Sequence, residues 1–209
     1  MKIKAVIFDW DGTLFNSMEY KRENFTRLFE GHSISHRDLI DFHQKYSGIP
    51  RKELINKCLQ HFQLQTLDDG AYQKISAKYT QMNIESSSQA VPFEDVEPGL
   101  MALKERGIKL FVSSSSAHDE LTLVSKKSGM RPYFEEVLGS QHGLNKGPDH
   151  VDYLCQKYHL TKCEILFLGD DEQDLILGEK AGVKTLRIRR KNKKGAEIQS
   201  LKELLDVLE

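Results

Sequence analysis

The sequence predicts an α/β fold, in which a parallel β-sheet is flanked by helices and a helical unit is inserted after the first strand. Three observations predict it. Short runs that are apolar on both faces recur along the chain, as expected for the buried strands of a parallel sheet. Helical patterns that end at a glycine alternate with these runs, which is typical of βαβ units. One long segment, 17–91, contains helical patterns without a convincing buried strand.

The expected strands are short and rich in β-branched and other apolar residues. The first covers residues 3–8, and the others are expected at 108–112, near 136–138, at 165–168 and at 184–188. The helical patterns of the same domain cover 98–106, 119–128, 148–158, 172–181 and 197–208. A glycine follows three of these patterns as a C-cap, and Pro148 stands at an early helical position.

Residues 17–91 form the inserted unit in this interpretation. Helices are expected there at 18–29, 37–45, 51–62 and 69–82. The third carries an apolar stripe at helical spacing, formed by Leu54, Cys58, Leu59 and Phe62. A polar stretch, 86–92, then returns the chain to the sheet. We therefore predict a core domain made of residues 1–16 and 92–209, and a helical domain made of residues 17–91.

The composition is that of an ordinary globular protein, with 39% hydrophobic and 29% charged residues among 209. The net charge of −1 argues against nucleic acid or an anionic membrane as a partner. No apolar run approaches the roughly 20 residues that span a bilayer, and the N-terminus lacks a secretory pattern. We expect a cytoplasmic protein. The basic run 187–194 is interpreted as a solvated loop after the last strand.

Two aspartates, Asp9 and Asp11, follow the first strand and precede Gly12 and Thr13. Because side chains alternate along a strand, both carboxylates start out on the same side of the chain. Carboxylates held close together repel one another, and a hard divalent cation, Mg²⁺ above all, relieves the repulsion. One carboxylate can then act as a nucleophile while its neighbour moves protons. The alternative is a strand end followed by an Asp-Gly turn.

Polar residues also follow other expected strands, and open parallel sheets bind ligands beyond the carboxyl ends of their strands. These residues are the serine run 113–116, Lys146, the pair Asp170 and Asp171, and Asp174. Each has an ordinary alternative: a helix N-cap, a solvated lysine, or acids favoured at a helix start. Together they provide a nucleophile, a cation site and donors for phosphate oxygens, which phosphoryl transfer needs.

In these motifs and their order, the chain resembles the haloacid dehalogenase superfamily of phosphohydrolases. The residues that resemble its four motifs are Asp9-Trp10-Asp11-Gly12-Thr13, then Ser113, then Lys146, then Gly169-Asp170-Asp171-Glu172-Gln173-Asp174. The resemblance implies a Rossmann-like core domain. A helical cap inserted directly after the first motif is similar to the branch that includes phosphoglycolate phosphatase and β-phosphoglucomutase.

The resemblance implies roles for the acidic residues. Asp9 would attack phosphorus and form an aspartyl-phosphate, while Asp11 would protonate the leaving oxygen and then activate water. Mg²⁺ would be held by a carboxylate oxygen of Asp9, the backbone carbonyl of Asp11 and the carboxylate of Asp170. Asp171 or Asp174 would hold these metal ligands in position without binding the metal directly.

The resemblance also implies where the substrate binds. Ser113, with backbone N–H groups near Ser114, would hold the phosphoryl oxygens, and Lys146 would offset charge between Asp9 and the phosphate. Arg51 lies in a segment that resembles the cap loop facing the active site in this branch. Arg51 or its neighbour Lys52 is a candidate for binding a distal anionic group of the substrate. A helix N-terminal turn with solvated charges is the alternative.

Three functions remain open at this point. The leading hypothesis is a monomeric, Mg²⁺-dependent phosphatase that acts on a small phosphorylated metabolite. Asp11 favours it over dehalogenation, because a departing halide needs no proton and an alkoxide does. The second is a sugar phosphomutase, against which Lys21 stands where that branch carries a histidine. The third is a non-enzymatic phosphoaspartate signalling domain, a class that lacks the large helical insertion.

Overall fold

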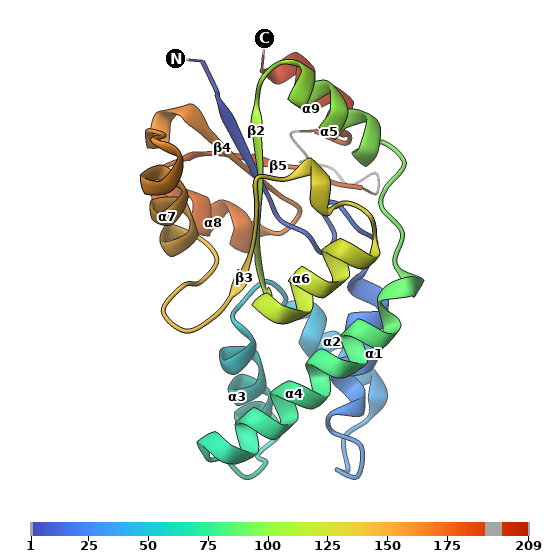
Figure 1. Cartoon of the computed structure of the whole chain (residues 1–209). Coiled ribbons are helices and arrows are strands. Elements are labelled where there is room, and N and C mark those ends of the chain that lie inside the picture. Colours follow the sequence, from blue (N-terminus) through green and yellow to red (C-terminus); the bar gives the residue numbers. More distant parts are fainter. Residues whose placement is uncertain (1, 191–197, 209) are drawn as a thin grey trace.

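The computed structural model describes residues 2–190 and 198–208. Within these ranges, five parallel strands form one sheet in the order β3-β2-β1-β4-β5 (Figure 1). The strands are β1 (Ala5–Phe8), β2 (Lys109–Ala117), β3 (Glu136–Ser140), β4 (Ile165–Gly169) and β5 (Lys184–Arg187). The expected α/β architecture and each expected strand are confirmed.

Strand β1 lies at the centre of the sheet because both of its faces are apolar. Val6 and Phe8 pack into one layer, whereas Ala5 and Ile7 pack into the other, and all four are fully buried. Burying a Val, Ile or Phe side chain contributes about 1.5–3 kcal/mol. The strand therefore anchors the residues that follow it against both neighbouring strands.

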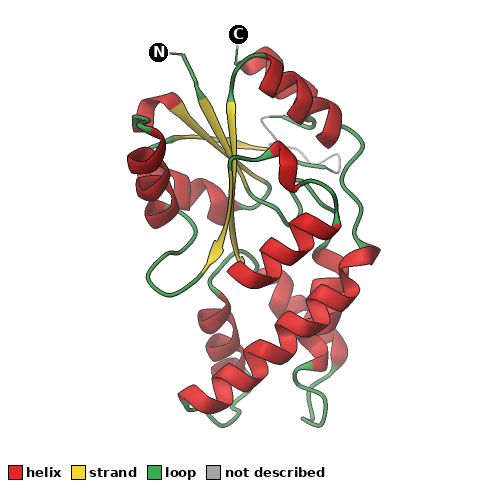
Figure 2. Ribbon diagram, viewed as in Figure 1, coloured by secondary structure: helices red, strands yellow, loops and turns green. Residues whose placement is uncertain are grey.

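Helices cover both faces of the sheet (Figure 2). On the face of Val6 and Phe8 lie α5 (Val96–Glu105), α6 (His118–Lys127) and α9 (Leu201–Val207). On the opposite face lie α7 (Pro148–Tyr158) and α8 (Glu172–Ala181). Short 3-10 helices occur in the connections: η1 (Ser87–Gln89), η2 (Arg131–Tyr133) and η3 (Lys162–Glu164). This three-layer arrangement is the expected Rossmann-like core.

The inserted unit consists of α1 (Met18–Arg27), α2 (His36–Lys45), α3 (Arg51–His61) and α4 (Asp69–Ser86). We call this unit, residues 18–86, the cap. Its helices pack around their own apolar cluster, which includes Phe25, Phe42, Ile55 and Tyr79. Ser35 and Asp68 accept hydrogen bonds from the first turns of α2 and α4, so each fixes where its helix begins. The cap lies beyond the carboxyl ends of the strands (Figure 1).

The two segments that join the cap to the core lie beside one another. The backbone N–H of Asn16 donates to the carbonyl of Val91 at 3.1 Å, and Phe15 forms an isolated β-bridge with Pro92. These contacts occur near the expected boundaries 16/17 and 91/92. The exact division into two domains stays a prediction.

The C-terminal region differs from two expectations. The last helix begins at Leu201 and not near 197, because Ser200 accepts a hydrogen bond from the N–H of Glu203. In the basic run, Arg190 is not solvated: it binds both carboxylate oxygens of Asp95 at 2.6 and 2.7 Å and donates to the carbonyl of Thr13. The last four residues of that run, 191–194, lie outside the described residues. None of the described helices combines the length and apolar character needed to cross a bilayer.

Candidate active site

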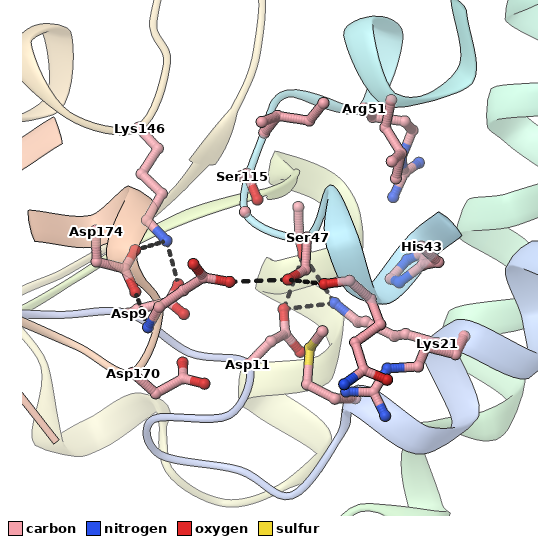
Figure 3. Close-up of a pocket in the computed structure, with 18 of the residues that line it drawn as sticks. Asp9, Asp11, Lys21, His43, Ser47, Arg51, Ser115, Lys146, Asp170 and Asp174 are labelled. Carbon is pink, nitrogen blue, oxygen red and sulfur yellow. Dashed lines mark hydrogen bonds and ion pairs between the residues drawn. The ribbon is translucent and has the colours of Figure 1, made fainter. Parts of the chain in front are cut away.

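A cavity of about 270 Å³ lies between the carboxyl ends of the strands and the cap. Core and cap both contribute to its wall (Figure 3). The core residues include Asp9, Asp11, Ser115, Ser116, Lys146, Asp170, Asp171 and Asp174, and the cap residues include Lys21, Arg22, His43, Ser47 and Arg51. The motifs identified in the sequence therefore meet at one place, although they are spread over most of the chain.

Three carboxylates converge on one side of the cavity. Phe8 of β1 lies in register with Leu168 of β4, so the residues just beyond the two strand ends are brought together. Asp9, Asp170 and Asp174 each offer an oxygen atom, and these three atoms lie within 4.8 Å of one another. Oxygen ligands at this spacing suit a hard cation such as Mg²⁺.

Two glycines allow this close approach. A Cβ on Gly12, whose φ is +84°, would lie 2.5 Å from a carboxylate oxygen of Asp170. A Cβ on Gly169 would lie 2.1 Å from an oxygen of Asp174. Thr13 donates a hydrogen bond to Asp170 at 3.1 Å and so orients this carboxylate. In both motifs, Gly-Thr and Gly-Asp, the glycine is needed because a larger residue would clash with a carboxylate, and the residue after it supplies a polar group of the site.

One buried lysine serves this carboxylate cluster. The Nζ atom of Lys146 lies 2.8 Å from Asp9 and 2.5 Å from Asp174 (Figure 3). Burial raises the pKa of Asp9 well above its usual value; Lys146 opposes this shift, while Asp174 and Asp170 add to it. Burial, followed by the charge of Asp174, raises the pKa of Asp170 to about 7. The cluster therefore holds more negative charge than its lysine balances.

Asp11 has different partners, although it is only two residues from Asp9. Ser17, Lys21 and Ser116 donate to its carboxylate at 2.5, 2.6 and 3.0 Å. Burial by itself would raise the pKa of Asp11, but the charge of Lys21 and these three hydrogen bonds outweigh burial and lower it. Trp10, between the two aspartates, is buried and stacks on Phe15. The chain thus directs its two carboxylates toward separate cations.

The serine run does not present its first members to the cavity. The hydroxyl of Ser113 is paired with Nδ1 of His150 at 2.8 Å, and the hydroxyl of Ser114 accepts from the N–H of Ser116 at 3.1 Å. Ser115 and Ser116 line the cavity instead. The register between β2 and β3 shifts between Ser113 and Ala117, and this irregularity changes which serines face the site. A phosphate-binding role for Ser113 and Ser114 stays a prediction.

The comparisons with known proteins agree with this geometry. The model of the family described as haloacid dehalogenase-like hydrolase matches residues 6–188. The chain belongs to this family. The resemblance seen in the motifs is thereby confirmed, and the protein is a hydrolase.

This haloacid dehalogenase-like hydrolase is 26% identical over 188 residues to the pyrophosphatase PpaX of Halalkalibacterium halodurans, covering 88% of this chain and 83% of that one. Its fold is similar to a structure from Haemophilus somnus described as a predicted phosphoglycolate phosphatase, with a TM-score of 0.81, 19% identity and 100% and 99% coverage. A hydrolase from Pseudomonas syringae gives a TM-score of 0.81 at 16% identity, with coverage of 98% and 97%.

Two other candidate residues of this haloacid dehalogenase-like hydrolase are held by protein groups. Arg51 lines the cavity, but its guanidinium pairs with Glu120 at 2.5 Å. Asp171 caps α8 through the N–H of Gln173 and also accepts from Ser47 of the cap at 2.8 Å. Substrate binding by Arg51 and metal support by Asp171 stay predictions.

Sequence reasoning missed several residues of this haloacid dehalogenase-like hydrolase that line the cavity or bind the candidate site residues. Glu120 and His150 are buried polar residues within helices α6 and α7, where a polar side chain ordinarily indicates a solvent-exposed position. Ser17 and Ser47 lie at a helix start and in a loop, where serine is common. Ser115 and Ser116 belonged to the motif that was found, but four identical residues carry no signal for which ones face the cavity.

Proposed function

We propose that this chain is a Mg²⁺-dependent phosphatase that hydrolyses a small phosphorylated compound through an aspartyl-phosphate on Asp9. The observation that carries the proposal is the cluster of Asp9, Asp170 and Asp174 around a single lysine. Its raised pKa values indicate that the cluster lacks positive charge, and a divalent cation would supply it. The donor set, made of oxygen atoms only, fits Mg²⁺.

In this proposal, a carboxylate oxygen of Asp9 attacks phosphorus, and the bond from phosphorus to the leaving oxygen breaks. Asp11 gives that oxygen the proton that it took from water in the preceding turnover. In the second step, Asp11 takes a proton from water, which attacks the phosphorus of the aspartyl-phosphate and releases phosphate and free Asp9. The hydrogen bonds from Ser17 and Ser116 hold the Asp11 carboxylate in a fixed orientation for both transfers.

When bound, Mg²⁺ would offset charge on the phosphate and on the carboxylates. The carboxylates of Asp9 and Asp170 and the backbone carbonyl of Asp11 would hold it, with Asp174 supporting Asp170 and Lys146. Ser115 and Ser116, which line the cavity, join Ser113 and Ser114 as candidates for holding phosphoryl oxygens.

The size of the cavity favours a small substrate, because about 270 Å³ is below the range of typical drug-sized pockets. The names of the similar proteins suggest pyrophosphate and phosphoglycolate as compounds to test alongside simple phosphate esters. A phosphomutase is less well supported, since Lys21 occupies the place of a histidine in that branch. A phosphoaspartate signalling domain is disfavoured by membership of a hydrolase family. A monomeric state and a cytoplasmic location stay predictions.

The test is phosphate release from a panel of phosphorylated compounds with Mg²⁺. We expect wild-type protein to release phosphate, and Asp9→Asn to lower the rate at least about 10³-fold. Asp152→Asn, at an exposed aspartate that pairs with Lys162, is the matched control and should keep the wild-type rate. An Asp9→Asn variant with wild-type turnover would contradict the proposal. Isomerised sugar phosphate without phosphate release would identify a mutase.

A further inference from the structure

A single core carboxylate receives side chains from three cap helices. Glu120, on the first turn of α6, is only 1% exposed. Arg51 of α3 approaches it at 2.5 Å, while Lys21 of α1 and Asn83 of α4 each lie at 3.2 Å. An isolated buried carboxylate is costly, and paired cations and donors offset that cost. Among the described residues, Glu120 is therefore one of two core carboxylates, with Asp11, through which ion pairs join the core and the cap.

Arg51 is held on other sides as well. Its guanidinium donates to the hydroxyl of Thr80 at 2.6 Å and to the carbonyl of Ser76 at 3.3 Å, and it lies over the ring of Tyr79 at 4.8 Å. The Arg51 side chain is 9% exposed. A substrate anion that took the place of Glu120 at Nη2 would break a buried ion pair, which is strongly unfavourable.

The side chains in direct contact with Glu120 and Asp11 balance in charge without a ligand. Lys21 contacts both Asp11 and Glu120, and Arg51 contacts Glu120, so two cations face two carboxylates. A further anionic group beside Arg51 would leave these four side chains with excess negative charge. Removal of the Glu120 charge would leave an excess positive charge close to Arg51, which a substrate anion could neutralise.

We propose that Glu120 takes the place of a substrate anion at Arg51 and is thereby a specificity-determining residue. It allows the cap to pack on the core without a second anionic group on the substrate, and it disfavours substrates that carry one at this end of the cavity. The substrate class is then a phosphate monoester whose leaving portion is uncharged where Arg51 lies. This inference rests on the proposed phosphatase function and narrows its substrate.

The test compares two probes, phenyl phosphate and a hexose bisphosphate, in wild type, Arg51→Gln, Glu120→Gln and the double variant. In Arg51→Gln, kcat/KM should fall by the same factor for both probes, because Arg51 acts through Glu120. In Glu120→Gln, the ratio of kcat/KM for the bisphosphate to that for phenyl phosphate should rise about tenfold, or about 1.4 kcal/mol. In the double variant, the ratio should return to the wild-type value.

Lys57 provides the matched control, because it lies on the same helix as Arg51 but pairs with Glu53 at 3.6 Å within that helix and is exposed. Lys57→Gln should leave kcat/KM for both probes within about twofold of wild type. The inference is overturned if Arg51→Gln selectively loses the bisphosphate, or if Glu120→Gln leaves the ratio unchanged. Should Glu120→Gln fail to fold, Arg51→Gln alone decides. Failure of the proposed function is a separate result, seen as turnover of both probes that survives Asp9→Asn.

Discussion

The two aspartates of the first motif lie in opposite electrostatic environments. Around Asp9, three carboxylates share Lys146, and the pKa values of Asp9 and Asp170 are raised. Around Asp11, two carboxylates share Lys21 and Arg51, and the pKa of Asp11 is lowered. The difference indicates where the proposed cation would bind: the carboxylates on the core side are short of positive charge, whereas Asp11 and Glu120 are already paired with Lys21 and Arg51.

Removal of Lys146 should have the largest effect, because Asp9 and Asp174 would both lose their cation inside the protein. We expect Lys146→Met to destabilise the metal-free protein by about 3–5 kcal/mol and to abolish phosphate release. Urea unfolding measures the first effect and a phosphate assay the second. Lys162→Met, at an exposed lysine that pairs with Asp152, serves as the control and should cost less than about 0.5 kcal/mol.

Removal of Lys21 should destabilise the protein less than removal of Lys146, although both lysines are buried. Glu120 would keep Arg51 and Asn83, and Asp11 would keep Ser17 and Ser116. We expect Lys21→Met to lose about 2 kcal/mol in the same urea experiment. If Lys21→Met lowers the free energy of unfolding as much as Lys146→Met does, the remaining partners do not stabilise Asp11 and Glu120. The proposed difference between the surroundings of Asp9 and of Asp11 would then be wrong.

The pH dependence of stability should have opposite signs on the two sides. The folded-state pKa of Asp170 is raised to about 7, so its ionisation costs stability as the pH rises through that value. Asp170→Asn should therefore raise the Tm of EDTA-treated protein at pH 8 more than at pH 5.

The folded-state pKa of Asp11 is lowered, so its carboxylate stabilises the fold above its unfolded pKa, and that contribution is lost as the pH falls through the folded pKa. Asp11→Asn should lower Tm at both pH 5 and pH 8.

The smallest effect on stability is expected at the hydrogen bond between the uncharged Ser47 hydroxyl of the cap and Asp171 of the core. Ser47→Ala removes the hydrogen bond to Asp171 and should cost about 1 kcal/mol or less in urea unfolding. Because Asp171 keeps the N–H of Gln173, the start of α8 should persist. A change in kcat/KM above about threefold would show that this contact also matters for closing the cap.

The positions of the strands, and the polar residues that gather at their carboxyl ends, were predictable from the sequence because general packing rules determine them. Residues apolar on both faces give buried parallel strands, and parallel strands bring Asp9, Lys146 and Asp170 to one edge. The orientation of the serine run was not predictable, since it depends on a register shift after Ser113. The ion pair of Arg51 was not predictable either, because its partner Glu120 lies 69 residues away in the sequence, on helix α6 of the core. Tertiary pairing of this kind leaves no local pattern in a sequence.

The paired crossing between core and cap has a mechanical consequence. Because Asn16 and Val91 are hydrogen-bonded and Phe15 bridges to Pro92, the two connections are paired with each other rather than independent. A rotation of the cap about this paired segment would admit a ligand without unfolding either connection. Since Asp11 forms a bridge with Phe15 in the same segment, the proposed proton-transferring group would stay close to the axis of such a rotation and move little while the cap turns.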